Sequence, residues 1–274
     1  MRKKEITTTL IVTTYNRPDA LEAVLESVRT QVWMPDEVIV ADDGSRDETR
    51  SLIKRYMNDF PTQLHHCWQE DRGFRLSEIR NKAILQSKCD YIIMIDGDMV
   101  LNRNFVRDHI SLAKPGHFIQ GSRVLLSQKN TENYLHNNVR KTLCWYSKGI
   151  KNRMNAVSCK SLMTFVSDFY GEKGVDGVRG CNMSYWKADV EKVNGFNQEF
   201  VGWGREDSEF VVRMLNSGIQ RINAKFGCVG FHLWHPENKP SDIELIENDK
   251  RLAEAEKAKV KVCENGLRHI SDVQ

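Results

Sequence analysis

The stretch Tyr91-Ile92-Ile93-Met94-Ile95-Asp96-Gly97-Asp98 joins a short apolar run to two acidic residues. An apolar run rich in β-branched and aromatic residues is typical of a strand that is buried in a parallel sheet. Open α/β folds bind their ligands outside the carboxyl ends of such strands, which is where Asp96 and Asp98 would lie. An isolated Asp-x-Asp motif is also common in solvated loops, so other segments have to discriminate between the two interpretations.

The acidic pair has a chemical requirement of its own. Two carboxylates held close together repel each other, and burial increases the cost. A cation offsets this repulsion, and hard oxygen ligands suit Mg²⁺ or Mn²⁺, which proteins commonly bind through carboxylates and substrate phosphates. The motif therefore predicts a divalent-metal site with Mn²⁺ or Mg²⁺ as cofactor.

The bulk properties of the chain restrict the class of protein. Its 274 residues suffice for one large α/β domain with insertions or for two small domains. The net charge of +3 is too small to indicate nucleic-acid binding, and no apolar run approaches the roughly 20 residues of a membrane-spanning helix. Seven scattered cysteines without a Cys-x-x-Cys pair argue against a disulfide framework or a zinc site, so we expect a cytoplasmic protein.

The first half of the chain alternates strand and helix patterns. This alternation implies an α/β fold with a mainly parallel sheet flanked by helices. The carboxyl ends of parallel strands meet at one edge, so the polar segments that follow them should lie together. The predicted strands are 8–14, 37–41, 63–68 and 91–95; the predicted helices follow Pro18, contain residues 49–56 and span 76–85; the polar segments are 13–17, 42–45 and 96–98.

Several side chains near this edge are suited to a nucleotide. Tyr15 can stack on a base, Asp43 can accept a hydrogen bond from a pyrimidine N–H, and Arg17 can approach a phosphate. Arg75 and Arg80 lie where a basic loop enters a predicted helix, and a helix start with arginines nearby is a natural anion site. Asp-Asp-Gly-Ser taken alone is equally typical of an ordinary turn. The prediction of a nucleotide site therefore depends on the presence of all these segments together.

The second half contains Val201-Gly202-Trp203-Gly204-Arg205-Glu206-Asp207. Glycines such as Gly204 allow a ligand to approach closely, and Trp203 offers a flat apolar face for a sugar ring. Glu206 and Asp207 open a predicted helix, where acids can simply interact with the helix dipole. The adjacent Gly-Trp-Gly has no capping purpose, so we interpret the segment as an acceptor-binding and catalytic loop.

His232 and His235 follow a predicted strand at 228–231. Histidines three residues apart can face one metal from a turn, and neutral imidazole binds Mn²⁺ alongside carboxylates. A lone histidine near a strand end is more often structural, but this pair lies downstream of the Asp-x-Asp motif. We therefore predict that at least one of the two joins Asp98 as a metal ligand.

Taken together, these motifs resemble glycosyltransferase family 2, whose members are inverting enzymes of the GT-A fold that use nucleotide-sugar donors. Thr-Thr-Tyr-Asn-Arg-Pro, Asp-Asp-Gly-Ser and Asp-x-Asp carry the resemblance over about residues 6–125. Residues 202–207 resemble the Gly-Trp-Gly-x-Glu-Asp motif of galactosyltransferase-like C-terminal halves, as in chondroitin-polymerase and β-1,4-galactosyltransferase relatives. This chain has Arg205 where the family often has glycine. The resemblance implies a GT-A-like (Rossmann-like) single domain with a C-terminal acceptor-binding half.

The resemblance also implies roles for individual residues. Thr13, Tyr15, Asp43 and the 71–80 region would contact the nucleotide. Asp96 and Asp98 would address the ribose, the diphosphate and the metal, with Asp98 the more direct ligand. In the acceptor-binding half, Asp207 would act as the base on the acceptor hydroxyl and Glu206 would assist, while metal ligands three residues apart match His232 and His235.

The chain then divides into a nucleotide-sugar-binding half (1–125), an insertion or lid (126–172), an acceptor-binding and catalytic half (173–240) and a C-terminal helical tail (241–274). The insertion is basic and aromatic, which fits either contact with anionic membrane or glycolipid, or a solvated helix pair over the site. Apolar residues of the tail predict a helix packed on the body. The residues behind these two interpretations are Arg140, Lys141, Leu143, Trp145, Tyr146, Lys148, Lys151, Arg153 and Lys160 in the insertion, and Ile243, Ile246, Leu252, Ala255 and Ala258 in the tail.

We therefore expect a metal-dependent, inverting transfer of a hexose-type sugar from a UDP-sugar to a hydroxyl of a glycan or glycolipid. A role in lipopolysaccharide or capsule synthesis, peripheral on the inner face of the plasma membrane, follows by analogy only. Two alternatives stay open. One is a catalytically inactive nucleotide-sugar or glycan-binding protein. The other is a sugar nucleotidyltransferase, which would release pyrophosphate and would not need Gly-Trp-Gly-x-Glu-Asp.

Overall fold

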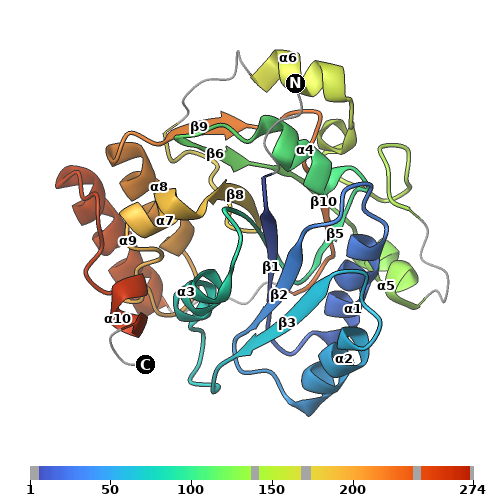
Figure 1. The fold of residues 1–274 in the computed structure, drawn as a ribbon, viewed down its shortest axis with the longest axis horizontal. Coiled ribbons are helices and arrows are strands. Elements are labelled where there is room, and N and C mark those ends of the chain that lie inside the picture. Colours follow the sequence, from blue (N-terminus) through green and yellow to red (C-terminus); the bar gives the residue numbers. More distant parts are fainter. Residues whose placement is uncertain (1–5, 137–141, 168–173, 237–241, 272–274) are drawn as a thin grey trace.

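The computed structural model describes residues 6–136, 142–167, 174–236 and 242–271 (Figure 1). Its centre is a seven-stranded sheet in the order β3-β2-β1-β4-β8-β6-β9, and a second sheet has the order β5-β10-β7. The strands are β1 (Thr8–Thr14), β2 (Glu37–Asp42), β3 (Gln63–Trp68), β4 (Tyr91–Asp96), β5 (Met99–Leu101), β6 (His117–Gln120), β7 (Ser122–Leu125), β8 (Asn182–Trp186), β9 (Gln220–Asn223) and β10 (Val229–His232).

Helices cover both faces of the large sheet (Figure 1). The three helices predicted in the first half of the chain are present, at residues 18–29, 47–57 and 76–86. The helices are α1 (Pro18–Arg29), α2 (Asp47–Met57), α3 (Leu76–Gln86), α4 (Phe105–Leu112), α5 (Gln128–His136), α6 (Lys160–Ser167), α7 (Lys187–Lys192), α8 (Glu206–Asn216), α9 (Asp242–Lys257) and α10 (Leu267–Ser271), with a 3₁₀ turn η1 (Arg153–Ala156).

The parallel half of the sheet confirms the sequence prediction. Strands β3, β2, β1 and β4 run parallel, and every residue of β1 and β2 is buried. Alternate side chains serve opposite faces: Leu10 and Val12 pack in the cluster that contains the α1 and α2 side chains, whereas Ile11 packs with α3. Two buried faces explain why these strands read as continuous apolar runs.

The second half of the chain closes the sheet with mixed pairing. Strand β8 lies antiparallel between β4 and β6, and β9 joins β6 in parallel. In the small sheet, β10 pairs antiparallel with β5 and parallel with β7. Strand β5 follows the Asp96-Gly97-Asp98 turn directly, so this pairing brings residues near position 232 beside that turn.

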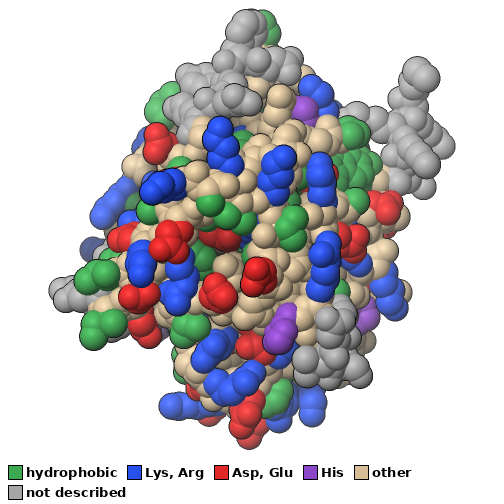
Figure 2. Space-filling view, turned by 90° about the vertical axis from the view of Figure 1, so that its left-hand side faces the viewer, with side chains coloured by type: hydrophobic (Ala, Val, Ile, Leu, Met, Phe, Trp, Pro, Cys, Tyr) green, Lys and Arg blue, Asp and Glu red, His purple; other side chains and the backbone are tan. Residues whose placement is uncertain are grey.

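The C-terminal tail forms the predicted helix, but the prediction that its apolar residues pack on the body is wrong at three positions, Ile243, Ile246 and Ala258, the last of which lies beyond the end of α9. Ile243 and Ile246 of α9 are 75% and 65% exposed. The helix instead buries Ala255 and the polar Asn248. Hydrogen bonds from Asn248 to the preceding loop fix the helix face that turns inward, so hydrophobicity alone gave the wrong face. Figure 2 shows acidic and basic side chains interspersed on the side of the molecule that carries α8–α10.

The two helices described in the insertion, α5 and α6, pack against different parts of the molecule. Helix α5 packs beside α1, while Met163 of α6 is buried in the core beside Gly227. Arg140, Lys141 and Asp168 lie outside the described residues. None of the helices in the described part is both long and apolar enough to cross a membrane. All seven cysteines are free. The predicted boundaries between the four parts of the chain stay a prediction.

Candidate active site

Three strand ends of the parallel sheet form the floor of the site. The register pairs Thr14 with Asp42 and Thr13 with Asp96, so the segments after β1, β2 and β4 lie at one edge as predicted. Gly97 fits here for a steric reason: a Cβ on it would lie 2.5 Å from the Thr13 carbonyl oxygen. The Asp-x-Asp turn therefore packs directly on the end of β1.

The segment after β2 presents a buried carboxylate. Asp43 accepts hydrogen bonds from the Gln69 side-chain amide at 2.6 Å and from the Arg75 backbone N–H at 2.9 Å. Burial raises the pKa of Asp43 to about 6. Each carboxylate oxygen keeps a further acceptor site, so the predicted contact with a base N–H is chemically possible. The Arg75 Nε atom is buried without a hydrogen-bond partner among the described residues.

The segment after β1 supplies three of the predicted nucleotide contacts. The Tyr15 side chain is 49% exposed, and its hydroxyl donates to Asp71 Oδ2 at 3.0 Å, which orients the ring. Thr13 donates to Asp96 Oδ1 at 3.1 Å. Arg17 is paired with Asp19 at 3.3 Å, and its charge acts on Asp98. Their nucleotide contacts stay predictions.

The predicted metal ligands come together at the junction of β4, β5 and β10. His232 pairs with Met99 in the small sheet, and the Leu233 N–H donates to the Asp98 carbonyl oxygen at 2.9 Å. The Nε2 atoms of His232 and His235 lie 3.5 Å and 3.3 Å from Asp98 Oδ2. One ligand atom from each of the three residues lies within 4.8 Å of the others.

The chemistry of this triad fits a divalent cation. Asp98 Oδ1 is buried and has no hydrogen-bond partner among the described residues, so a negatively charged oxygen is left unsatisfied. Burial raises the pKa of Asp98 and lowers the pKa of His232, which favours neutral imidazole, the form that binds metal. One carboxylate with two imidazoles is a donor set that suits Mn²⁺.

The loop before α8 is held open by backbone geometry and by α9. Gly204 has φ +107°, which a residue with a side chain rarely adopts, and Trp203 is left 55% exposed. The Asn248 side-chain amide donates to the carbonyl oxygens of Val201 and Gly204 at 3.2 Å and 3.1 Å. The predicted stacking residue therefore stands in solvent on a loop that α9 fixes in place.

Glu206 and Asp207 have different environments at the start of α8. Glu206 is 9% exposed and forms an ion pair with Arg80 at 3.2 Å, and burial together with the Asp207 charge raises the pKa of Glu206 to about 7. Asp207 is half-buried and accepts backbone N–H groups from Gly180 and Ser208, each at 2.7 Å. Asp207 is the more accessible of the two carboxylates, since Glu206 is buried and paired with an arginine.

Arg80 lies at the centre of the site rather than at its surface. The side chain is 1% exposed, and its guanidinium contacts Glu206 and, at 3.5 Å, Asp96 Oδ1. It also lies over the Phe196 ring at 5.1 Å from the centroid. Arg80 thus connects the Asp-x-Asp turn to the catalytic loop. A direct contact with the nucleotide stays a prediction, and the bridging position was not foreseen from the sequence.

Sequence reasoning missed two other residues. Asn248, which anchors the acceptor loop, was hidden in a charge-rich helix; the available signal was a single asparagine among acidic and basic neighbours. Arg123 on β7 acts electrostatically on His232 and on Cys181. The signal for Arg123 was one charged residue within an apolar strand pattern, Ser122-Arg123-Val124-Leu125.

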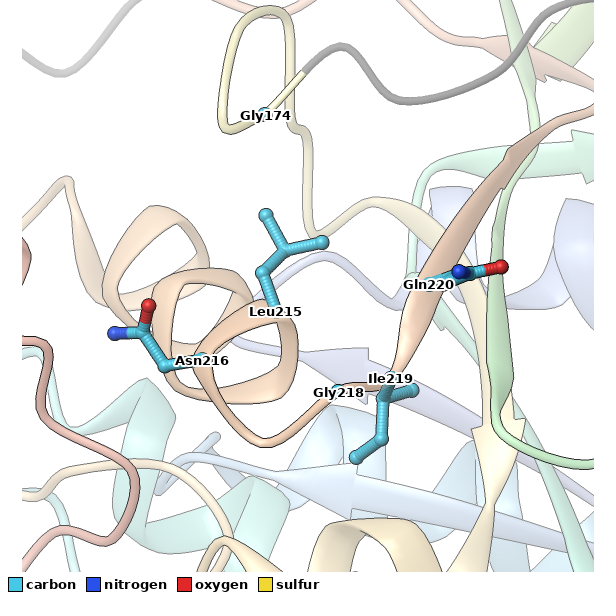
Figure 3. A pocket seen from close by; sticks show the side chains of 6 residues that line it. All are labelled: Gly174, Leu215, Asn216, Gly218, Ile219 and Gln220. Carbon is cyan, nitrogen blue, oxygen red and sulfur yellow. The ribbon is translucent and has the colours of Figure 1, made fainter.

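A hollow on another part of the surface has no comparable chemistry. It lies where α8 ends and β9 begins, with a volume of about 280 Å³ (Figure 3). None of its lining residues carries a charge, so we assign the chemistry to the strand-end site. The lining residues are Gly174, Leu215, Asn216, Gly218, Ile219 and Gln220.

Comparisons with curated proteins point to polysaccharide synthases. The chain is 27% identical to a chondroitin synthase of Escherichia coli over 248 residues, which cover 81% of this chain and 34% of that protein. It is 29% identical to a hyaluronan synthase of Pasteurella multocida over 226 residues, which cover 76% of this chain and 23% of that protein. The chain therefore spans about a quarter to a third of the length of these relatives.

Solved structures share the fold. Staphylococcus aureus TarS (residues 1–349) in complex with UDP-GlcNAc aligns with a TM-score of 0.61 at 17% identity, covering 96% of this chain and 69% of that one. A mannosyltransferase from Pyrobaculum calidifontis in complex with GDP-Man and Mn²⁺ aligns with a TM-score of 0.60 at 16% identity, covering 92% and 65%. These similarities confirm the GT-A fold.

Family models match almost the whole described site. A model described as the N-terminal domain of galactosyltransferase matches residues 160–232, which include the Gly-Trp-Gly-Arg-Glu-Asp loop and His232. The model for glycosyl transferase family 2 matches residues 9–170, which include the three polar strand ends. The chain therefore belongs to glycosyltransferase family 2, and it is an enzyme of that family with a galactosyltransferase-like C-terminal half.

Proposed function

We propose that this protein transfers a hexose-type sugar from a UDP-sugar to a hydroxyl of a glycan or glycolipid, with inversion at the anomeric carbon and with dependence on Mn²⁺ or Mg²⁺. One observation carries the proposal. The Asp98–His232–His235 triad and the Asp207 carboxylate belong to one connected site, in which Asp96 and Arg80 lie between them. Such a site can hold a diphosphate at one end and a nucleophile at the other.

Asp207 would take the proton of the acceptor hydroxyl. Its Oδ1 atom accepts hydrogen bonds from the N–H and the hydroxyl of Ser208, whereas Oδ2 accepts one from the Gly180 N–H and keeps a free lone pair for the proton. Attack from the face opposite the diphosphate gives inversion, and general-base catalysis contributes about 10²–10⁴ in rate. Trp203 would stack on the acceptor sugar.

The donor end of the site would be held by the strand-end residues. Tyr15 and Asp43 would contact the base, and Asp96 would address the ribose. Asp98, His232 and His235 would hold the divalent ion, which when bound supplies positive charge to the leaving diphosphate. Support for a nucleotide-sugar donor comes from the similar folds that were solved with UDP-GlcNAc and with GDP-Man.

A donor screen tests the proposal. Purified protein is incubated with UDP- and GDP-sugars and acceptor oligosaccharides, with Mn²⁺, with Mg²⁺ or with EDTA, and free nucleoside diphosphate is measured. We expect metal-dependent UDP release and a product of inverted anomeric configuration. GDP release would correct the donor, and pyrophosphate release would indicate a nucleotidyltransferase. Nucleotide-sugar binding without any turnover would indicate an inactive binding protein.

We further propose that the enzyme works in lipopolysaccharide or capsule synthesis as a cytoplasmic protein in peripheral contact with anionic membrane. Trp145, Tyr146 and Met154 are 54%, 71% and 70% exposed in the insertion, among the exposed cations Lys148 and Lys151. Exposed aromatic and basic side chains together favour binding at an anionic lipid surface.

Sedimentation with anionic vesicles tests the membrane contact. Replacing Lys148, Lys151 and Arg153 by Gln should weaken binding, and binding should fall with salt because exposed charges are screened over about 10 Å at 0.1 M. A control that replaces Lys250, Lys257 and Lys259 of the C-terminal part removes the same charge elsewhere. If both variants sediment with the vesicles as the wild type does, the insertion is a solvated helix pair that does not bind membrane.

A further inference from the structure

Arg123 is placed on a rigid part of the site. It lies on β7, where it pairs with Gly230 of β10, and its carbonyl oxygen accepts a hydrogen bond from the Asn155 side chain at 3.2 Å. The same register pairs Leu125 with His232. Because side chains alternate along a strand, Arg123 and His232 emerge on the same face of the small sheet.

The charge of Arg123 reaches both ends of the site. It lowers the pKa of the metal-facing His232, and it opposes the rise that burial causes in the pKa of Cys181. Cys181 follows Gly180, whose N–H binds the carboxylate of Asp207. The guanidinium of Arg123 therefore lies near both the metal triad and the segment that holds the base.

In the described part of the chain, the Arg123 guanidinium has no protein partner, in contrast to those of Arg17 and Arg80. Arg17 is paired with Asp19, and Arg80 is paired with Glu206 and Asp96. Within residues 6–136, 142–167, 174–236 and 242–271, the Arg123 guanidinium has neither a carboxylate partner within 4.0 Å nor a hydrogen bond. A partly buried, unpaired guanidinium in a site lined by acids is suited to an anion that arrives with the substrate.

We propose that Arg123 binds the diphosphate of the donor and stabilises it as it leaves. This inference rests on the proposed function. The bond between the anomeric carbon and the β-phosphate oxygen breaks, and its electron pair remains on that oxygen. The acceptor oxygen forms the new bond to the anomeric carbon and gives its proton to Asp207. Arg123 stays protonated throughout and pairs with the oxygen that gains charge.

Nucleotide binding tests this role without a turnover assay. Calorimetry compares uridine, UMP and UDP, each with Mn²⁺ and with EDTA, for the wild type, Arg123→Met, Arg123→Lys and Arg55→Met. Arg55 is a control of the same type, since its side chain is 66% exposed on α2. We expect Arg123→Met to lower UDP affinity about 10- to 100-fold, as for the loss of a charge-assisted hydrogen bond. Uridine affinity should change by less than about threefold.

The remaining arms separate this inference from the donor assignment. Arg123→Lys should keep UDP affinity closer to the wild type than Arg123→Met, and Arg55→Met should match the wild type. Wild-type affinity for UDP in Arg123→Met would overturn the role of Arg123 and leave the UDP donor standing. An equal loss for uridine and UDP would also overturn it, since the defect would then not concern the diphosphate. A wild type that binds no UDP would overturn the donor assignment and this role with it.

Discussion

The site contains two buried acidic groups that are neutralised in different ways. On the acceptor side, Glu206 is paired with Arg80, a cation that belongs to the protein. On the donor side, Asp98 faces two histidines and keeps one buried oxygen without a partner. Burying a carboxylate is costly unless it is paired. Glu206 is paired within the folded chain, whereas Asp98 keeps an unsatisfied oxygen that a bound cation would satisfy.

This difference separates a permanent framework from a site that is completed with its substrate. The Arg80 bridge holds the catalytic loop against the Asp-x-Asp turn before any ligand binds. A divalent metal at the triad would complete the coordination of Asp98, and such metals commonly bind together with substrate phosphates. Substitutions on the two sides should therefore differ in whether they affect stability, turnover or metal-dependent binding.

The largest effect is expected at Asp207. Asp207→Asn cannot accept the acceptor proton at neutral pH, so we expect transfer to fall about 10²- to 10⁴-fold with nearly unchanged UDP-sugar affinity. The asparagine keeps one oxygen acceptor for the two N–H groups of Gly180 and Ser208, so thermal melts should accompany the kinetics. The measurement is the rate of UDP-sugar consumption at saturating acceptor. Wild-type turnover in Asp207→Asn together with an inactive Glu206→Gln would show that Glu206 is the base.

The second effect concerns the donor side. Asp98→Ala removes the only carboxylate of the described metal triad. We expect Mn²⁺ to stop increasing UDP affinity in calorimetry, whereas metal-free UDP affinity should not fall, because the base contacts at Tyr15 and Asp43 remain. Asp47→Ala, which removes an exposed acid on α2 outside the metal triad, is a control of the same type. Unchanged enhancement by Mn²⁺ in Asp98→Ala would place the metal elsewhere.

The third effect is a pH dependence of stability on the acceptor side. The pKa of Glu206 is raised to about 7 in the folded chain, from an ordinary value of 4.5. Its contribution to stability is therefore fully present below about pH 4.5 and is lost as the pH rises to about 7. Glu206→Gln lacks this titration, so the wild type should lose on the order of 1–3 kcal/mol relative to the variant across that interval.

Urea unfolding at a series of pH values measures this difference. Asp43, whose pKa is raised to about 6, contributes with the same sign in both proteins, so the comparison isolates Glu206. Glu199→Gln, an exposed residue, serves as the control. Parallel stability curves for the wild type and Glu206→Gln would contradict the raised pKa of Glu206 and would mean that Arg80 keeps this carboxylate ionised over the whole interval.

The smallest effect is expected at the contact between α9 and the acceptor loop. Asn248→Ala removes two hydrogen bonds to carbonyl oxygens and should destabilise the protein by about 1–3 kcal/mol. It should also raise the KM for acceptor with little change for donor, since the Trp203 loop would be less ordered. Lys250→Ala, on the exposed side of the same helix, is the control. An unchanged acceptor KM would restrict Asn248 to a role in stability.

Sequence reasoning succeeded where local pattern decides structure. The strand at 8–14 has the predicted bounds, because a β-branched run that is buried on both faces leaves little alternative. The strand at 63–68 also has the predicted bounds, although Leu64 is its only buried residue. The metal triad was predicted from residue type and spacing, and the structure brings its members together. The prediction that Ile243 and Ile246 pack on the body was wrong: both are exposed, whereas Asn248 of the same helix is buried and donates two hydrogen bonds to the loop before α8.

The family, the parallel half of the sheet and the residue types that line its edge could be predicted from the sequence alone. These follow from periodicity and from short motifs, in which the interacting residues are close along the chain. Two features could be read only from the folded chain. Arg80 contacts both Asp96 and Glu206, and Glu206 lies 126 positions from Arg80 along the sequence. Arg123 lies on the same face of the small sheet as His232. Such contacts depend on sheet register and on which charges share a buried space, and no local pattern encodes either.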